Sequence, residues 1–305
     1  MSKCKGCGVK LQYEDETKLG FTPKKDGKLC QRCFKITNYN EHVQVIDKID
    51  NEDIIKGINS KKGATLFLCD ILSLNKNVMS WYNKINNPKC LVITKSDIIP
   101  KNIKYNKLAK KIMDVYNVED LIFASSLNGE GKNDIISYLK DYDKVIFAGP
   151  TSSGKSSLIN YLFNLKLTVS NRKNTTQEFI NIKNEYGQVY DAPGFNEEYL
   201  EDSIKVAGYI NPRTISLKPG YELHIGKLII SSEKETNITL FLPKDVIISS
   251  KKCVNKLEKE ISVDSQCDLI IDNIGFIYFK NEANIECNDD CYLDIRQSIV
   301  GDVHE

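Results

Sequence analysis

Short apolar runs alternate with amphipathic segments through the first half of the 305-residue chain. The runs are four to eight residues long and are bounded by turn or charge signals, as buried parallel strands are. They predict strands over residues 64–71, 89–94, 121–124 and 144–148. Between the runs, apolar residues at helical spacing predict helices over 76–87, 103–117 and 132–140. The alternation predicts an α/β sheet with helices on both faces.

The pattern changes on either side of this region. Residues 1–40 are rich in Cys, Lys and Gly and have no sustained apolar period. After about residue 205, apolar positions alternate with polar ones and β-branched or aromatic residues are enriched, which predicts strands. The expected strands are 221–231, 237–242, 245–249, 268–272 and 275–280. We therefore expect three domains, a cysteine-rich module over 1–40, an α/β domain over 41–204 and a β-rich domain over 205–305.

Composition adds few constraints to this picture. Hydrophobic residues make up 41% and charged residues 27% of the chain, as in globular proteins, and the net charge of +1 neither favours nor excludes a nucleic-acid partner. No apolar run approaches the roughly 18 residues that span a bilayer. The first residues lack the apolar core of a secretory signal. We expect a cytoplasmic protein with no membrane or DNA partner, in which the ten cysteines favour metal ligation over disulfides.

A phosphate-binding pattern, G-x-x-x-x-G-K-S, occupies residues 149–156 between a predicted strand and a helical pattern. Glycines at its ends let backbone N–H groups turn towards a phosphate, and the helix N-terminus adds a favourable dipole. Lys155 is expected to bridge the β- and γ-phosphates, and the Ser156 hydroxyl to ligate Mg²⁺. The other residues expected to contact the nucleotide are Gly149, Thr151, Ser152, Ser153, Gly154 and Ser157.

A candidate guanine-reading motif, Thr94-Lys95-Ser96-Asp97, lies upstream of that loop and ends a predicted strand. The Asp97 carboxylate would accept hydrogen bonds from guanine N1–H and the 2-amino group, a donor pair that adenine lacks, and Lys95 would lie over the ring. About 30 residues later, Ser125 and Ser126 follow the next apolar run and would supply backbone donors to guanine O6. Ligands bind at the carboxyl ends of strands in open α/β sheets.

A candidate switch, Asp191-Ala192-Pro193-Gly194, lies 36 residues after Lys155 and follows a strand-like run. Asp191 would hold Mg²⁺ through water, and the Gly194 N–H would meet the γ-phosphate, as glycine permits close approach. Thr176, in a polar and basic loop, is expected to complete the Mg²⁺ coordination. Lys155, Thr176 and Gly194 are thus the candidates that act on the reacting phosphate. Phe195 stands where a Ras-like enzyme carries the glutamine that orients water, so slow intrinsic hydrolysis is expected.

The order of these motifs along the chain is base, base support, phosphate loop, switch I and switch II. In an ordinary GTPase the phosphate loop comes first and the base-reading motif fourth. If all five motifs belong to one site, the chain is a circularly permuted GTPase that binds GTP or GDP with Mg²⁺.

Two C-x-x-C pairs, Cys4 with Cys7 and Cys30 with Cys33, are separated by 22 residues. They are able to close one tetrahedral Zn²⁺ site with no open position, which would be structural. The alternative is a redox dithiol. Residues 1–35 carry nine Lys or Arg against four acidic residues, a modest indication of RNA contact.

The segments Cys4–Gln12, Leu29–Phe34 and Asn38–Asn40 resemble the zinc-binding start of YqeH-type circularly permuted GTPases, and the motif order matches that family. The resemblance covers about residues 1–215. It implies a treble-clef-like zinc finger, a permuted GTPase domain of the TRAFAC class and a small C-terminal module. It also implies a role in assembling the small (30S) ribosomal subunit, with rRNA or the pre-subunit as partner. Potassium-stimulated relatives carry Asn where this chain has Ser152.

Two other functions fit the same motifs. The first is a P-loop ATPase or small-molecule kinase, which Asp97 discriminates because a carboxylate there selects guanine. The second is a non-enzymatic scaffold that binds zinc and RNA and merely retains a nucleotide. Such a scaffold would be indifferent to the loss of Lys155.

Overall fold

We describe a computed structural model of the chain in residues 2–5, 9–16, 20–31, 33–34, 50–165, 179–196, 209–226, 228–252, 257, 259–271, 274–288 and 293–301. By their contacts, the chain segments group into two units, each of which is described by itself. The first comprises Met1–Asp70, Ser80–Lys95 and Ile122–Glu198. The second comprises Ile71–Met79, Ser96–Leu121 and Tyr199–Glu305.

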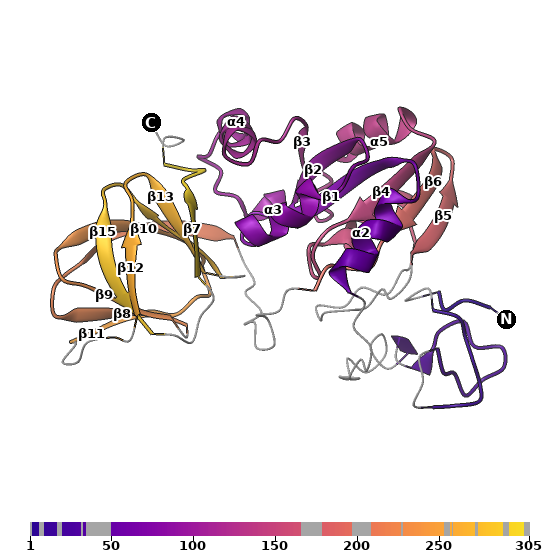
Figure 1. Ribbon diagram of the computed structural model, residues 1–305, viewed down its shortest axis with the longest axis horizontal. Helices are drawn as coiled ribbons and strands as arrows, with labels where there is room; N and C mark the ends of the chain where they lie inside the picture. Colours follow the sequence, from indigo (N-terminus) through magenta and orange to yellow (C-terminus); the bar gives the residue numbers. More distant parts are fainter. Residues whose placement is uncertain are drawn as a thin grey trace. The chain divides into compact units, whose positions relative to one another are not determined.

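A six-stranded sheet with the order β3-β2-β1-β4-β6-β5 forms the centre of the α/β region (Figure 1). Its strands are β1 (Ala64–Asp70), β2 (Lys89–Thr94), β3 (Leu121–Phe123), β4 (Lys144–Ala148), β5 (Ile180–Asn184) and β6 (Gly187–Asp191). Strands β2, β1, β4 and β6 pair in parallel, whereas β5 runs antiparallel to β6. β4 is fourth along the chain but lies between β1 and β6, so the strand that carries the phosphate loop is central.

The helices follow the predicted alternation. They are α2 (Asn51–Asn59), α3 (Lys76–Asn83), α4 (Tyr105–Tyr116), α5 (Lys132–Lys140) and α6 (Lys155–Phe163), with a 3₁₀ turn η1 (Ser96–Ile98). α3 is shorter than predicted because Asn87 and Pro88 come soon after it, and the residue before a proline disfavours the helical region. None of the helices in the described part of the chain is long and apolar enough to cross a membrane.

Alternate residues of β1 face opposite sides of the sheet. Leu66 and Leu68 share one buried cluster with residues of α5 and α6, among them Ile135 and Leu158. Phe67 points to the other side, where its ring lies 5.6 Å from that of Tyr82. Every residue of β1 is buried, as expected for a strand covered on both faces. The predicted α/β sheet is confirmed.

The C-terminal region forms two five-stranded antiparallel sheets with the orders β16-β13-β14-β10-β7 and β11-β8-β9-β15-β12. The first contains β7 (Ile210–Leu217), β10 (Thr236–Pro243), β13 (Cys267–Ile271), β14 (Gly275–Phe279) and β16 (Leu293–Gln297). The second contains β8 (Tyr221–Ile225), β9 (Leu228–Ser232), β11 (Ile248–Lys252), β12 (Lys259–Val263) and β15 (Ala283–Cys287). Both sheets contribute to one apolar core, so the region is a β-sandwich.

The predicted β-rich character of this region is confirmed, but two expected strands differ. Residues 221–231 form two strands, β8 and β9, because Gly226 adopts a φ of +60° in the turn between them. The strand expected over 245–249 lies at 248–252 instead, after the turn formed by Pro243 and Val246.

Within the second unit, the buried Arg296 connects the sandwich to the segments 71–79 and 96–121. The Arg296 Nε donates to Asp268 Oδ2 at 3.0 Å, and its Nη1 donates to the Leu74 carbonyl. Tyr116 Oη donates to the same carbonyl at 3.2 Å. Near the rim, the Lys76 N–H donates to the Asp294 carboxylate at 3.1 Å. The loop after β1 and the end of α4 thus pack with strands β13 and β16.

Candidate functional site

The phosphate loop after β4 is shaped by three residues with positive φ, Gly149 (+142°), Ser152 (+69°) and Gly154 (+84°). A Cβ at Gly149 would lie 2.0 Å from the carbonyl oxygen of Leu68 in β1, so this position accepts only glycine. The loop runs directly into α6, which begins at Lys155. Its backbone therefore wraps the N-terminus of a helix, an arrangement that favours anions.

A phosphate would give two side chains of the loop a better hydrogen-bond partner. Lys155 is buried, and its ammonium donates to the carbonyls of Gly149 at 2.9 Å and Pro150 at 2.8 Å. A phosphate would offer it a charged acceptor in place of these neutral ones. The buried Ser153 hydroxyl has no hydrogen-bond partner among the described residues. Because an unmade buried hydrogen bond is costly, this hydroxyl fits a ligand oxygen.

The candidate base-reading strand is tied directly to the phosphate loop. Thr94, the last residue of β2, donates its hydroxyl to the Ser153 carbonyl at 2.7 Å. Lys95 follows with a φ of +55°, and its ammonium lies 2.5 Å from Oδ2 of the buried Asp70, at the end of β1. Asp97 lies in η1, which belongs to the second unit, and Tyr105 Oη donates to the Ser96 carbonyl there at 3.0 Å.

The base-support segment forms a tight loop after β3. The Ser125 N–H donates to the Glu130 carbonyl at 3.1 Å, and its hydroxyl accepts from the Leu127 N–H at 3.1 Å. Since the Ser125 N–H is engaged within the loop, Ser126 is the better placed of the two serines to offer a backbone donor to a base. Ser125 therefore shapes the loop in this structure.

A hydroxyl and a carboxylate meet where β6 ends. Ser156 Oγ donates to Oδ2 of Asp191 at 3.3 Å, and Asp191 is fully buried. Hard oxygen ligands of this kind suit Mg²⁺, so these residues fit the ion expected with a nucleotide. Gly194 follows close by, since a Cβ there would lie 2.9 Å from Thr151 Oγ1. The predicted third ligand, Thr176, lies outside the described residues.

The side chain of Phe195 points into the protein core. It is fully buried, stacks on Trp81 with ring centroids 5.0 Å apart, and lies 5.9 Å from the ring of Phe67. Its backbone pairs with the phosphate loop, because the Phe195 N–H donates to Gly149 O at 3.2 Å and its carbonyl accepts from the Thr151 N–H at 3.0 Å. The ring stands where a Ras-like enzyme carries glutamine, and its packing also holds the switch against the sheet.

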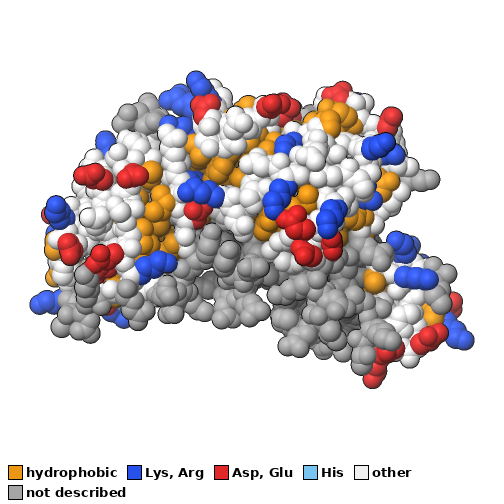
Figure 2. Space-filling view, in the orientation of Figure 1, with side chains coloured by type: hydrophobic (Ala, Val, Ile, Leu, Met, Phe, Trp, Pro, Cys, Tyr) orange, Lys and Arg blue, Asp and Glu red, His pale blue; other side chains and the backbone are white. Residues whose placement is uncertain are grey.

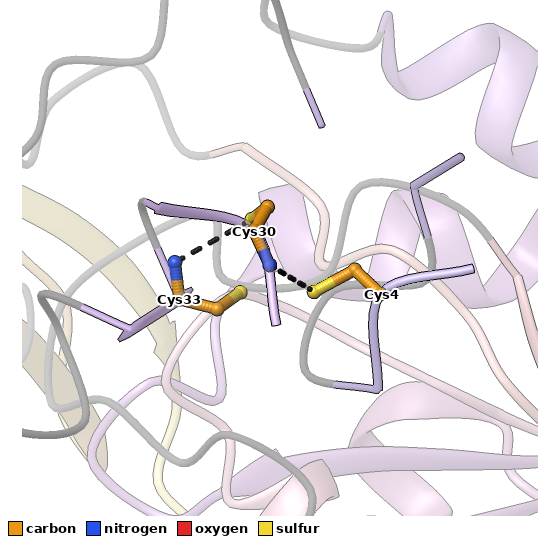
Figure 3. Close-up of side chains that lie close together, drawn as sticks. All are labelled: Cys4, Cys30 and Cys33. Atoms are coloured by element: carbon orange, nitrogen blue, oxygen red, sulfur yellow. Dashed lines mark hydrogen bonds between the residues drawn. The ribbon is translucent and has the colours of Figure 1, made fainter. Parts of the chain in front are cut away.

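Three of the four predicted zinc ligands come together in the N-terminal module (Figure 3). The sulfurs of Cys4, Cys30 and Cys33 lie within 4.8 Å of one another, and all three side chains are buried. Sulfurs bound tetrahedrally to one Zn²⁺ lie about 3.8 Å apart, given a Zn–S bond of about 2.3 Å. Backbone N–H groups of Cys30 and Cys33 point at the sulfurs of Cys4 (3.2 Å) and Cys30 (3.5 Å). Cys7 lies outside the described residues.

Among the described residues, the apolar core around these cysteines is small. It consists there of Leu11 and the three cysteines, with Val9 and Leu29 packed against them. A core of this size does not normally hold a fold without a disulfide or a metal, and the described cysteines form no disulfide. The donor set therefore fits a structural Zn²⁺.

Sequence reasoning missed several residues that shape the site. Asp70 was detectable, because it is the charged residue that ends a mainly apolar run, and ligands bind at the carboxyl ends of strands. The contacts of Trp81 with Phe195, and of Asn51 with Asn196, join positions far apart in sequence and leave no local signal.

Two protein-family models match this chain. The model described as RsgA GTPase matches residues 37–201, more than half of the chain. The model described as 50S ribosome-binding GTPase matches residues 144–271. The second match begins at Lys144, the first residue of β4, the strand that leads into the phosphate loop.

Several known proteins are similar to the chain. The protein YqeH of Bacillus subtilis (strain 168) is 30% identical over 297 residues, covering 83% of this chain and 78% of the relative. The small ribosomal subunit biogenesis GTPase RsgA of Parasynechococcus marenigrum (strain WH8102) is 31% identical over 142 residues, covering 43% and 46%.

Among solved structures, YjeQ from Thermotoga maritima is 23% identical, covering 43% of this chain and 48% of its own. Its TM-score of 0.33 is too low to compare the two folds. The chain thus spans about half the length of the RsgA relative and of this structure. From the match to YqeH, the RsgA GTPase model and the position of β4 in the sheet, the chain belongs to the family of circularly permuted GTPases that includes YqeH.

Proposed function

We propose that this protein is a GTP-hydrolysing switch that assists assembly of the small (30S) ribosomal subunit in the cytoplasm and binds rRNA or a pre-ribosomal particle. The observation that carries this proposal is the hydrogen bond from Thr94 to the Ser153 carbonyl. Through this bond the end of β2, which leads into the candidate base-reading motif, contacts the phosphate loop, which supports a single site built from motifs in permuted order. The name of the RsgA relative, small ribosomal subunit biogenesis GTPase, supports the ribosomal role.

In this proposal the nucleotide spans the carboxyl edge of the sheet. Asp97 accepts hydrogen bonds from guanine N1–H and the 2-amino group, while Lys95 covers the base with its ammonium held by Asp70. The Ser126 N–H meets guanine O6. The phosphates lie in the loop 149–156, where Lys155 exchanges its two carbonyl partners for β- and γ-phosphate oxygens.

Mg²⁺ would be held by Ser156 directly and by Asp191 through water, with Thr176 as the third protein group. The ion would neutralise charge that develops on the phosphate oxygens. Gly194 would donate its N–H to the γ-phosphate, so that the segment after β6 is ordered by GTP and released on hydrolysis.

Intrinsic hydrolysis should be slow. The Phe195 ring lies in the core against Trp81, so the residue after Gly194 does not orient a water. In our proposal the attacking water is placed by another group or by the assembling subunit, and turnover rises when the partner is bound. This would couple hydrolysis to a step of assembly.

The cysteine module is the part of the chain that we assign to RNA contact, with its Zn²⁺ as a structural element. Six of its lysines are exposed in the described residues, namely Lys3, Lys5, Lys10, Lys24, Lys25 and Lys28. Basic and acidic side chains are interspersed over the described part of the face that Figure 2 shows. A basic module around a zinc site suits phosphate contacts.

The proposal is tested by sedimentation of the full-length protein with purified small subunits in GDP or a non-hydrolysable GTP analogue. We expect association with the analogue and release with GDP. Lys155→Ala should remove this nucleotide dependence and reduce turnover about 10²–10³-fold, the usual cost of losing a charge-stabilising donor. Lys144→Ala, at the exposed start of β4, is the matched control and should behave as the wild type.

Two results would contradict the proposal. Failure to sediment with small subunits in either nucleotide would remove the assembly role. Association that is the same in both nucleotides and in Lys155→Ala would favour the non-enzymatic scaffold. A preference for ATP over GTP would favour the ATPase or kinase.

A further inference from the structure

The side chain of Asn51 makes two hydrogen bonds to the backbone of a residue 145 positions later. Its Nδ2 donates to the Asn196 carbonyl at 2.8 Å, and its Oδ1 accepts from the Asn196 N–H at 2.8 Å. A primary amide that satisfies both backbone groups of one residue fixes the rotation of that backbone as well as its position. Asn51 is the first residue of α2, and Asn196 comes directly after the switch residue Phe195.

Helix α2 is an anchored support for this contact. Asp50 caps its N-terminus by accepting from the Glu52 N–H at 2.9 Å. At the other end, Asn59 repeats the amide arrangement, donating to the Lys84 carbonyl at 3.1 Å and accepting from the Asn86 N–H at 3.0 Å. Ile54, Ile55 and Ile58 bury its apolar face. Because the helix is itself held at both ends and along its apolar face, Asn51 gives the backbone of Asn196 a fixed point of attachment.

The held segment is the one that must present Gly194 to a γ-phosphate. Gly194 lies between the buried Asp191 and the buried Phe195 ring, and the Phe195 backbone pairs with Gly149 and Thr151 of the phosphate loop. Asn51 fixes the backbone one residue beyond. Because the backbones of Phe195 and Asn196 are both held, the direction of the Gly194 N–H is set before any nucleotide binds. Such preorganised donors are the groups that stabilise developing charge most effectively.

We propose that Asn51 is a positioning residue for GTP hydrolysis, which holds the switch backbone so that Gly194 faces the γ-phosphate. This inference rests on the proposed GTPase function and names a residue outside every recognised nucleotide motif. Its effect is specific to the triphosphate, because GDP lacks the phosphate that Gly194 would contact.

The test compares Asn51→Ala with Asn59→Ala in the full-length protein. Each variant removes one amide and two backbone hydrogen bonds from the same helix, so both should lower the melting temperature by a similar few degrees. Asn51→Ala should lower kcat about tenfold and weaken a non-hydrolysable GTP analogue about fivefold, part of the loss expected for an oxyanion-type donor. GDP affinity should stay within about twofold of the wild type, since a shift of that size is under half a kcal/mol.

A second substitution at Asn51 alters only the hydrogen bond to the Asn196 carbonyl and so distinguishes a positioning effect from misfolding. Asn51→Asp keeps the acceptor for the Asn196 N–H but sets a carboxylate oxygen against the Asn196 carbonyl, so its kcat and its GTP-to-GDP affinity ratio should fall at least as far as those of Asn51→Ala. The inference is overturned if Asn51→Ala and Asn59→Ala have the same kcat and the same affinity ratio. If the wild-type protein itself neither binds nor hydrolyses GTP, the proposed function fails first, and the two failures are thereby distinguished.

Discussion

Buried polar side chains gather in two regions of this protein, and their partners differ. At the carboxyl edge of the sheet, Ser153 has no partner among the described residues, and the Lys155 ammonium donates to the carbonyls of Gly149 and Pro150. In the β-sandwich, the buried Asp268 and Arg296 meet at 3.0 Å, and the Ile299 N–H also donates to Asp268 at 3.2 Å. Burial raises the pKa of the Asp268 carboxyl, and Arg296 opposes that rise.

This difference distinguishes the edge of the sheet, which binds a ligand, from the Asp268–Arg296 ion pair, which stabilises the fold. A buried polar group that binds a ligand is left without a protein partner, as the Ser153 hydroxyl is among the described residues, because the ligand supplies one. Asp268 and Arg296 instead find a charged partner in each other, while Oδ1 of the one and Nη2 of the other have no partner among the described residues. The comparison predicts that mutations at the edge change nucleotide affinity at little cost in stability, while mutations of the pair do the reverse.

The largest expected effect is on the pair. Arg296→Met would leave the Asp268 carboxylate buried and unpaired, and should lower the free energy of unfolding by about 3–5 kcal/mol. Urea denaturation followed by circular dichroism measures this loss. The double variant Asp268→Leu/Arg296→Met should recover part of it, since an apolar pair carries no buried charge but leaves the Ile299 N–H without its acceptor. GDP affinity should be unchanged in both variants, and a parallel fall would break the comparison.

Phe195 belongs to the candidate nucleotide site, but its side chain lies in the apolar core. Phe195→Gln should lower the free energy of unfolding by about 3 kcal/mol, because the amide would be buried beside Trp81 and Phe67 with no partner. It should not speed GTP hydrolysis, although it restores the Ras-like residue, because this side chain points into the core. Phe195→Leu is the control and should lose less stability. Single-turnover kinetics decide the matter, and faster hydrolysis in Phe195→Gln would contradict the account.

The smallest expected effect sharpens the comparison most. Ser153→Ala removes a buried hydroxyl that has no partner in the described structure, so the nucleotide-free protein should be as stable as the wild type or more stable by about 1 kcal/mol. GDP affinity should nevertheless fall about fivefold, the value of one hydrogen bond. Thermal denaturation with and without GDP measures both quantities. Loss of stability without loss of affinity would show that Ser153 is an ordinary core residue.

The sequence predicted the sheet well because its strands are buried on both faces and read as mainly apolar runs, as in β1, where Thr65 and Asp70 are the polar residues. The loop at Gly149 was also predictable, because its G-x-x-x-x-G-K-S pattern is recognisable in the sequence. The close approach of Leu68 O explains why this position requires glycine. The sandwich was harder, because polar and exposed residues interrupt strands such as β11 and β12. What no local pattern reveals is pairing over long distances, as between Asn51 and Asn196 or Asp268 and Arg296.

The central claim is that motifs in a permuted order build one guanine-nucleotide site, and titration of the wild type and Asp97→Asn with GDP and xanthosine diphosphate tests it most directly. The wild type should prefer GDP by about 10²-fold, as expected for two hydrogen bonds to one carboxylate. Asp97→Asn should reverse the preference, because an amide is able to donate to the xanthine 2-oxo group. Equal affinity of the wild type for both nucleotides, or no change of preference in Asp97→Asn, would contradict the account.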